Sequence, residues 1–252
     1  MSDLAGKTIV LVHGAWHGGW CWREVADRLN ARGAQVFAPT MTGLGERRHL
    51  RTAYKGLETF ITDIASVIEF EDLAKITLVG HSFGGMIITA IADRMPERIR
   101  RLVYLDAAVP FDGHSMIGGP DLPQDRVAKT VAGLRALTAD GEWMRPIPLD
   151  VLGLAEASPE LRASVTRKLT EHPLSSWTDV LHFRNGGPKC PCTYLWCNAP
   201  AMKSTSFPVH YENAKAGFYG ADWTTRTVAT GHEAMLTAVD ETASLIAEAA
   251  VF

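Results

Sequence analysis

Short apolar runs that alternate with segments of helical periodicity restrict the fold of this chain most strongly. Lys7–Val12 is a continuous β-branched run, typical of a strand that is buried on both faces of a parallel sheet. Ile76–Val79 and Leu102–Leu105 are further runs of this kind. Parallel strands need crossover connections, and the intervening helical patterns provide them. The pattern predicts an α/β fold with a mostly parallel sheet flanked by helices.

The remaining elements continue this order. We expect helices at Trp22–Ala31, Thr59–Phe70, Gly85–Met95 and Glu241–Val251, and strands at Gln35–Ala38, Thr193–Trp196 and Thr225–Val228. The strand pattern disappears between residues 110 and 189, where short helical patches lie near Asp125–Leu137 and Ser158–Leu169. We interpret residues 110–189 as a helical cap inserted into a core made of residues 1–109 and 190–252.

A serine between glycines directly follows the strand Ile76–Val79 and directly precedes a helix. The segment Gly80-His81-Ser82-Phe83-Gly84 has the pattern of a nucleophile elbow, in which a strained turn lifts the serine hydroxyl out of the sheet. Small residues are needed where the backbone passes close to itself, and Gly80, Gly84 and Gly85 meet that need. The position therefore favours Ser82 as a nucleophile over an incidental serine in a glycine-rich turn.

A serine hydroxyl needs a base to take its proton at neutral pH, and histidine titrates in the required range. Gly231-His232 follows the last predicted strand and stands well after the serine in chain order, as this arrangement requires. The other histidines lie in the elbow, in the first loop or in less diagnostic segments. His232 is therefore the predicted general base.

Attack on an acyl carbon forms an oxyanion, which needs preorganised donors, usually two backbone amides. The N–H of Phe83, the residue after the nucleophile, is one predicted donor. The loop after the first strand, His13-Gly14-Ala15-Trp16, offers the N–H of Ala15 as the second, since Gly14 allows a tight turn. Phe83 and Ala15 together form the predicted oxyanion hole.

Several motifs together resemble one branch of the α/β-hydrolase superfamily. They are the stretch HGAWHGGWCW from His13 to Trp22, the stretch TGLGER from Thr42 to Arg47, the serine elbow, Val103-Tyr104-Leu105-Asp106 and Gly231-His232. The chain is similar in these motifs to plant methyl-ester esterases, hydroxynitrile lyases and bacterial pyrethroid- and carbamate-type esterases. The resemblance spans nearly the whole chain except the cap and implies an α/β-hydrolase fold. Its motifs are specific for this branch but give little information about the substrate.

Two positions separate this chain from the lyases of that branch. The lyases carry a threonine where this chain has Gly14, and a lysine where it has Glu233. A lyase needs a cation to hold the departing cyanide, and an acidic side chain there would oppose it. Both differences favour hydrolysis.

The acidic member of a Ser-His-Asp triad is where the sequence departs from the plant relatives. Their acid follows the strand that corresponds to Thr193–Trp196, and here that place is near Pro200, without a carboxylate. Related hydrolases place the acid after the preceding strand, where this chain has Asp106. Asp106 is therefore the predicted acid that orients His232. The alternatives are Glu212, Asp222 and Glu233.

Large apolar side chains indicate the character of the substrate pocket, which we expect between the carboxyl edge of the sheet and the cap. The predicted substrate-binding residues are Trp16, Trp143, Trp177 and Met235, with Phe83, Met116 and Met144 as further candidate lining. Such a lining favours an apolar acyl or aromatic group over a sugar or a phosphate.

Charge and composition exclude other classes of function. The net charge of -3 comes without a long block of Lys or Arg, which argues against nucleic acid and anionic membranes as partners. The most basic stretch, residues 46–51, is interpreted as a solvated loop. The four cysteines have neither zinc nor thioredoxin-like spacing, and no phosphate loop is present. We therefore expect free thiols, no metal and no cofactor.

The start of the chain bears on its location. Residues 1–7 are polar and lead into a short apolar strand, too short for the apolar region of a signal peptide or for a membrane span. We predict a cytoplasmic protein without a membrane partner. The sequence leaves a homodimer open.

These observations predict a serine hydrolase that cleaves a small apolar or aromatic ester, carbamate or related acyl bond through an acyl-enzyme on Ser82. Two alternatives remain, because a fold does not fix a function. One is hydroxynitrile-lyase-like or cofactor-free C–C bond chemistry, including a cofactor-free oxygenase. The other is a non-enzymatic small-molecule receptor on the same fold.

Overall fold

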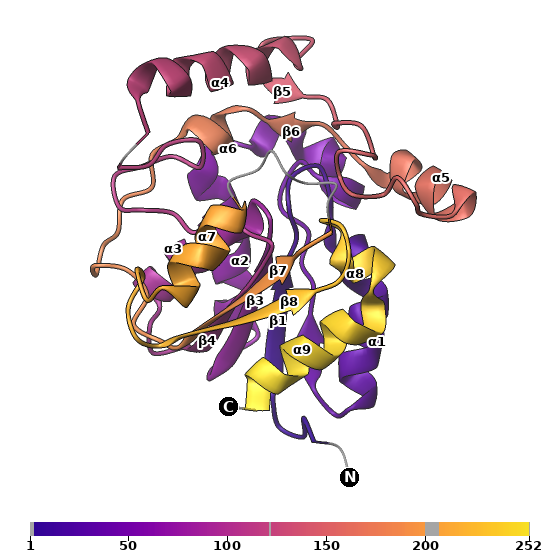
Figure 1. The fold of residues 1–252 in the computed structure, drawn as a ribbon, viewed down its shortest axis with the longest axis vertical. Helices are drawn as coiled ribbons and strands as arrows, with labels where there is room; N and C mark the ends of the chain where they lie inside the picture. The colour runs from indigo at the N-terminus through magenta and orange to yellow at the C-terminus, as the bar shows by residue number, and fades with distance from the viewer. Residues whose placement is uncertain (1–2, 121, 200–206, 252) are drawn as a thin grey trace.

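One parallel sheet organises the chain, whose computed structural model describes residues 3–120, 122–199 and 207–251. Its strand order is β2-β1-β3-β4-β7-β8, with every neighbouring pair parallel. The strands are β1 (Thr8–Val12), β2 (Gln35–Phe37), β3 (Ile76–His81), β4 (Ile99–Leu105), β7 (Cys192–Cys197) and β8 (Trp223–Val228). This architecture confirms the predicted fold class (Figure 1).

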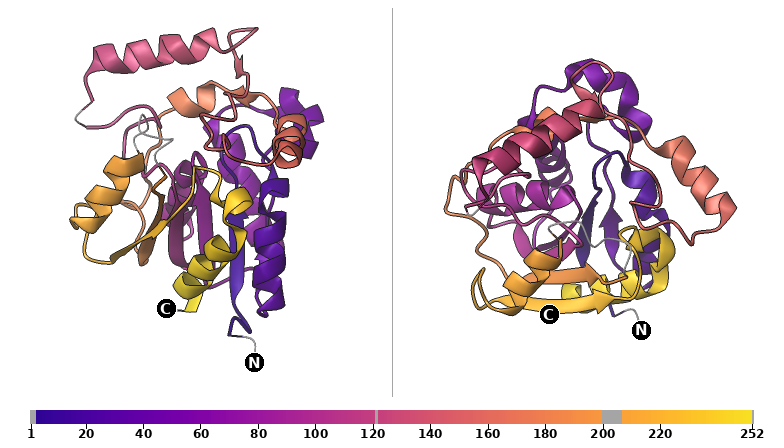
Figure 2. Two further views of the ribbon diagram at one scale, coloured as in Figure 1. Left: turned by 45° about the vertical axis from the view of Figure 1, so that its right-hand side comes forward. Right: turned by 45° about the horizontal axis from the view of Figure 1, so that its top comes forward.

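Helices cover both faces of the sheet (Figure 2). α1 (Arg23–Ala31) and α9 (Val239–Val251) lie on one face, while α2 (Leu57–Phe70), α3 (Gly84–Arg94) and α7 (Phe207–Lys215) lie on the other. β1 shows why its apolar run is continuous. Val10 and Val12 join the hydrophobic cluster beside α2 and α3, whereas Ile9 and Leu11 join the cluster beside α1 and α9. Successive side chains of a strand point to opposite faces, so a strand buried on both faces needs apolar residues throughout.

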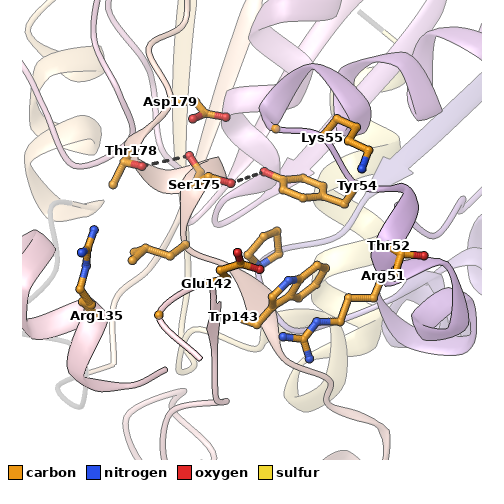
Figure 3. A pocket seen from close by; sticks show the side chains of 14 residues that line it. Arg51, Thr52, Tyr54, Lys55, Arg135, Glu142, Trp143, Ser175, Thr178 and Asp179 are labelled. Carbon is orange, nitrogen blue, oxygen red and sulfur yellow. Dashed lines mark hydrogen bonds between the residues drawn. The ribbon is translucent and has the colours of Figure 1, made fainter. Parts of the chain in front are cut away.

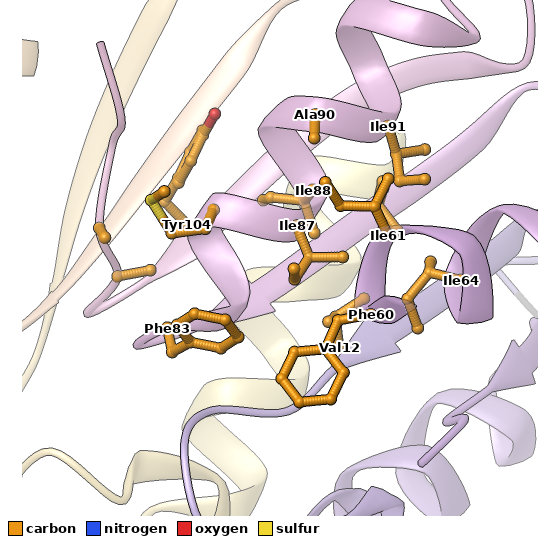
Figure 4. Close-up of a cluster of buried hydrophobic side chains, with 14 of the residues drawn as sticks. Val12, Phe60, Ile61, Ile64, Phe83, Ile87, Ile88, Ala90, Ile91 and Tyr104 are labelled. Carbon is orange, nitrogen blue, oxygen red and sulfur yellow. The ribbon is translucent and has the colours of Figure 1, made fainter. Parts of the chain in front are cut away.

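The cluster beside α2 and α3 extends to the carboxyl edge of the sheet. Ile87 and Ile91 of α3 belong to one hydrophobic cluster with Phe60 and Ile64 of α2 and with Phe83 (Figure 4). The rings of Phe60 and Phe83 lie 5.9 Å apart between centroids. The start of α3, which follows the serine elbow, is thereby anchored in the core.

The segment between β4 and β7 carries no strand of the main sheet. It contains α4 (Gln124–Ala136), the two-residue strands β5 (Trp143–Met144) and β6 (His172–Pro173), α5 (Pro159–Lys168) and α6 (Ser175–Thr178). The two helical patches were predicted, but β5, β6 and α6 are too short for a periodicity to reveal them. α4 and β6 lie beyond the carboxyl ends of the strands, and both chain ends lie on the opposite side of the sheet, near the amino ends of the strands (Figure 1).

Further short helical segments lie in the connections between the longer elements: η1 (Gly19–Trp22), η2 (Gly45–Ala53) and α8 (Ala234–Thr237). Residues 46–51 belong to the helical segment η2 rather than to a loop, and Glu46, Arg48 and His49 are exposed, as expected of a solvated segment. Arg47 donates to the carbonyl oxygen of Thr40 at 2.7 Å. Arg51 forms an ion pair with Glu171 at 2.7 Å and another with Asp140. Asp140 and Glu171 are remote in sequence from Arg51, so the local charge pattern did not reveal these ion pairs.

The cysteines form no disulfide. Cys21, Cys190, Cys192 and Cys197 are free thiols, as predicted. Among the described residues, no helix combines the length and the apolar character that crossing a bilayer requires.

Replacement of a core valine tests the packing of the sheet. We expect Val10→Ala to lower the free energy of unfolding by about 2 kcal/mol, because it removes buried methyl groups and leaves a cavity. Val209→Ala on α7, where the side chain is 58% exposed, is the matched control and should change it by less than about 0.5 kcal/mol. Urea unfolding measures both, and equal effects would contradict the packing described.

Candidate active site

The carboxyl ends of the parallel strands bring the predicted catalytic residues to one edge of the sheet. Ser82 follows β3, Asp106 follows β4, and His232 lies between β8 and α8. The loop that contains Ala15 follows β1, the neighbour of β3. Sites in α/β sheets form at such an edge, since loops from several strands meet there. These residues are far apart in the sequence but therefore lie close together at the carboxyl ends of the strands.

Ser82 occupies a strained turn between β3 and α3. Its φ of +54° lies in the left-handed region, which is uncommon for a residue with a side chain. A Cβ on Gly80 would lie 2.8 Å from the backbone of Gly84, and one on Gly85 would lie 2.0 Å from the carbonyl oxygen of Ala108. Only glycine fits these two positions, as the sequence predicted for an elbow.

Gly14 gives the first loop close access to Ser82. A Cβ at this position would lie 2.9 Å from both Ser82 Cβ and His81 Nδ1. The threonine that the lyases of the resembled branch carry here would not fit this arrangement. The absence of a side chain therefore keeps the loop and the serine in contact.

Asp106 and His232 are joined by a buried hydrogen bond. His232 Nδ1 lies 2.6 Å from Asp106 Oδ2, and the two side chains are 4% and 1% exposed. The backbone N–H of Cys197 donates to the other carboxylate oxygen at 3.4 Å. Of the alternative acids, Asp222 precedes β8 at the opposite end of the strands, and Glu212 is exposed on α7. Within the described residues, Asp106 is thus the acid that contacts His232 Nδ1.

The surroundings of His232 favour its protonated form. Burial of the ring works to lower its pKa, but the hydrogen bond and charge of Asp106, together with the charge of Glu233, outweigh this effect and raise the pKa above its usual value. His81 Nε2 lies 3.0 Å from the backbone carbonyl oxygen of His232, and the ring of Phe207 stacks on His232 at 5.1 Å. The imidazole is held on several sides, and its charged form is stabilised.

The hydroxyl of Ser82 remains free of other partners. Across the described ranges, Ser82 Oγ forms no hydrogen bond, either with His232 or with any other group. Catalytic hydrogen bonds are often long before a substrate binds. The serine, which is 8% exposed, is therefore available to a reacting group at the sheet edge.

The two predicted oxyanion donors are also free. In the part of the chain that the structure describes, neither the N–H of Phe83 nor that of Ala15 has an acceptor. Phe83 caps the start of α3, where the partial positive charge of the helix adds to the N–H. The first loop is braced by His13, whose Nε2 accepts from the N–H of Met41 at 3.1 Å and whose pKa burial lowers to about 3.

Two of the predicted substrate-binding residues lie near this site. The ring of Trp16, next to Ala15, packs against Trp177 at 5.5 Å and near His172 at 6.1 Å. His172 in turn contacts Phe83 at 4.9 Å. The aromatic surroundings expected of the site are present around these side chains.

The structure places the other two predicted substrate-binding residues elsewhere. Met235 is fully buried in the cluster beside α1 and α9, so the structure assigns it to the core. Trp143 lies under the guanidinium of Arg51 and lines a cavity of about 720 Å³ whose walls include Lys55, Glu142 and Asp179 (Figure 3). Neither Ser82 nor His232 lines this cavity. A residue type alone did not reveal which side of a loop faces the nucleophile.

Sequence reasoning missed Phe207 and His172. Phe207 begins α7, which was not predicted, and a lone aromatic residue gave no signal that it stacks on His232. His172 was grouped with the less diagnostic histidines, although its Nδ1 accepts from the N–H of Trp16 at 3.4 Å. Both act through contacts between remote segments.

One cluster has the composition of a metal site. His81, His232 and Glu233 bring potential ligand atoms within 4.8 Å of one another among the described residues. His81 Nε2 and His232 Nδ1 already have hydrogen-bond partners. A metal would therefore have to bind Nε2 of His232, the nitrogen with which the predicted base would accept a proton, so we assign these residues to the protein's own hydrogen-bond network.

The sequence matches the family described as "Alpha/beta hydrolase family" over residues 9–245. It is 42% identical over 182 residues to a carbendazim hydrolyzing esterase from Nocardioides sp. (strain SG-4G), covering 71% of this chain and 74% of that protein. It is 33% identical over 158 residues to Methylesterase 2 from Arabidopsis thaliana, covering 57% of this chain and 52% of that protein. The alignment with this plant relative thus spans about half of its length.

Solved structures show the same fold. An extracellular alpha/beta-hydrolase from a Paenibacillus species matches with a TM-score of 0.80 and 23% identity, covering 97% of this chain and 99% of its own. A pyrethroid hydrolase from Sphingobium faniae JZ-2 matches with a TM-score of 0.70 and 18% identity, covering 96% of each chain. At these identities the likeness concerns the fold alone.

The hydrogen bond between Asp106 and His232 predicts a measurable titration. We expect Asp106→Asn to lower the pKa of His232, because the substitution removes the anionic partner of the imidazolium. NMR titration of His232 measures the shift, with the exposed Asp222→Asn as the control that leaves it unchanged. An equal pKa in wild type and Asp106→Asn would contradict the contact.

Proposed function

The chain belongs to the alpha/beta hydrolase family, and on this premise we propose that it is a carboxylic ester hydrolase with Ser82 as nucleophile, His232 as general base and Asp106 as the acid. The observation that carries the proposal is the buried hydrogen bond between Asp106 and His232 beside a free serine in an elbow. The esterase relatives, one of them 42% identical, support the same class of reaction.

Acylation follows from this arrangement. Ser82 Oγ attacks the acyl carbon while His232 Nε2 takes the hydroxyl proton. Asp106 stabilises the imidazolium that forms, which is the form that the site favours. The N–H groups of Phe83 and Ala15 donate to the oxyanion of the tetrahedral intermediate. When this intermediate collapses, the alcohol leaves with the proton from His232, and the acyl group remains on Ser82.

Deacylation uses the same groups in a second cycle. His232 takes a proton from a water molecule, whose oxygen attacks the acyl-enzyme. The second tetrahedral intermediate collapses, and Ser82 Oγ leaves with the proton from His232. An ester yields a carboxylic acid and the regenerated serine, a carbamoyl group on Ser82 would leave as a carbamic acid, and water is the only further reactant.

The substrate class is a small apolar or aromatic ester or carbamate. Trp16, Trp177 and Phe207 supply aromatic surfaces around Ser82 and His232, and these rings favour an apolar group. One named relative is a carbendazim hydrolyzing esterase and another is a methylesterase. Their names support small esters and carbamates as the substrate class. In this proposal, residues 110–189 act as a cap over the core of residues 1–109 and 190–252. The free thiols agree with a cytoplasmic location.

Removal of the nucleophile tests the proposal. We expect Ser82→Ala to lower kcat for a short-chain p-nitrophenyl ester by at least about 10³-fold, because the acyl-enzyme cannot form. Ser66→Ala on α2, remote from the sheet edge, is the matched control and should keep wild-type activity. Ester hydrolysis that survives in Ser82→Ala would contradict the assignment, and cyanide release from a cyanohydrin by the wild type would favour lyase chemistry.

Loss of the acid has a separate signature. We expect Asp106→Asn to lower kcat by about 10³- to 10⁴-fold, since His232 loses the carboxylate that orients its ring and stabilises its imidazolium form. Asp222→Asn should remain near wild type, because Asp222 lies at the other end of the strands. Steady-state kinetics at constant pH compares the two variants, and a loss in Asp222→Asn instead would assign the acid there.

A further inference from the structure

Glu233 is a buried carboxylate that the proposed reaction does not use. Its side chain is 0% exposed, and within the described residues neither carboxylate oxygen has a well-aligned hydrogen-bond partner. An ionised carboxylate in such a place is costly unless a charge of opposite sign lies near. The nearest group of that kind is His17, whose Nε2 lies 3.3 Å from Glu233 Oε2.

The second ring nitrogen of His17 fixes where its protons lie. Nδ1 lies 2.8 Å from the backbone carbonyl oxygen of Ala15. A carbonyl oxygen only accepts, so Nδ1 carries a proton. A proton on Nε2 as well makes His17 an imidazolium that faces the carboxylate of Glu233. The indole of Trp20, stacked on the His17 ring at 5.3 Å, also favours the cation.

Burial keeps four other titratable groups around His17 neutral, namely His13, His81, His172 and Cys21. Burial lowers the pKa of His13, His81 and His172, and it raises the pKa of the Cys21 thiol, to which the charge of Glu233 adds. His232 also lies close to Glu233, whose charge contributes to its raised pKa, but its Nδ1 is paired with Asp106 at 2.6 Å. The pair of Glu233 and His17 is therefore electrically balanced within the cluster.

The carbonyl that His17 holds belongs to the oxyanion loop. The peptide between Ala15 and Trp16 is held on both sides, since Ala15 O faces His17 Nδ1 and the N–H of Trp16 donates to His172 Nδ1. Trp16 has a φ of +65°, a conformation that persists only where the surroundings hold it. The orientation of the adjoining Ala15 N–H depends on these contacts.

We propose that Glu233 is a positioning residue: its ion pair with protonated His17 holds the peptide between Ala15 and Trp16 and so orients the Ala15 N–H toward the oxyanion. Because Glu233 directly follows His232, the pair ties the loop of the base to the loop of the donor. The inference rests on the proposed function, since acyl transfer is the chemistry that needs this donor.

Nitrogen-15 NMR of the histidine side chains tests the ion pair without turnover. We expect His17 to carry protons on both ring nitrogens in the wild type and on Nδ1 alone in Glu233→Met. His17→Asn identifies the signals of His17 by their loss. A His17 ring that is neutral in the wild type overturns the ion pair, whether or not the protein hydrolyses an ester.

Steady-state kinetics with a p-nitrophenyl ester tests the positioning role. Loss of an oxyanion donor lowers kcat by about 10²- to 10³-fold, and its displacement should lower kcat less. We expect Glu233→Met and His17→Asn each to lower kcat by about 10- to 100-fold with KM within about twofold. The double variant should lose no more than either single variant, since both act through one contact.

Conservative and matched variants complete the test. Glu233→Gln, whose amide can donate to a neutral His17, should recover most of the loss. Glu241→Met, an exposed position on α9, should show no loss. Glu233→Met removes one partner of a buried pair, which costs stability, so kcat is compared at a temperature at which every variant is folded. Wild-type kcat in Glu233→Met, a loss carried by KM, or losses that add in the double variant would each overturn the proposal.

If the wild type hydrolyses no ester, the proposed function fails separately.

Discussion

The close approach of three backbone segments at the carboxyl edge of the sheet determines the geometry of the site. A Cβ on Gly84 would lie 2.8 Å from the carbonyl oxygen of Val12, and one on Gly85 would lie 2.0 Å from that of Ala108. A Cβ on Gly14 would lie 2.9 Å from Ser82 Cβ. These contacts fix Ser82, the proposed nucleophile, between the loop of the proposed oxyanion donor and the loop of the proposed acid. The parallel register of β1, β3 and β4 brings these segments together.

Two buried carboxylates act on this edge in different ways. Asp106 contacts the ring of His232 directly and stabilises its charged form. Glu233 follows His232 in the chain but faces His17 in the loop after β1. Both charges are removed from solvent, so their effect on neighbouring groups is stronger than at the surface. In the proposed mechanism, one carboxylate serves the base and the other serves the oxyanion donor.

The sequence predicted the features that depend on local pattern. The apolar runs of β1 and β3 predicted buried strands, and the elbow around Ser82 was visible because its glycines and its flanking elements are adjacent in the chain. The interactions between remote segments could not be predicted this way. Phe207 stacks on His232 from a helix with no clear periodicity, and Met235 points into the core although it lies three residues after the base. Which side a loop residue faces is set by tertiary packing.

Labelling with a fluorophosphonate followed by peptide mass mapping shows whether Ser82 is the residue that carries the acyl group. Such a reagent reacts with a serine that an adjacent base activates. The account predicts one adduct, on the peptide that contains Ser82, and its loss in His232→Ala. An adduct on another serine, or none on a folded wild type, would contradict the account.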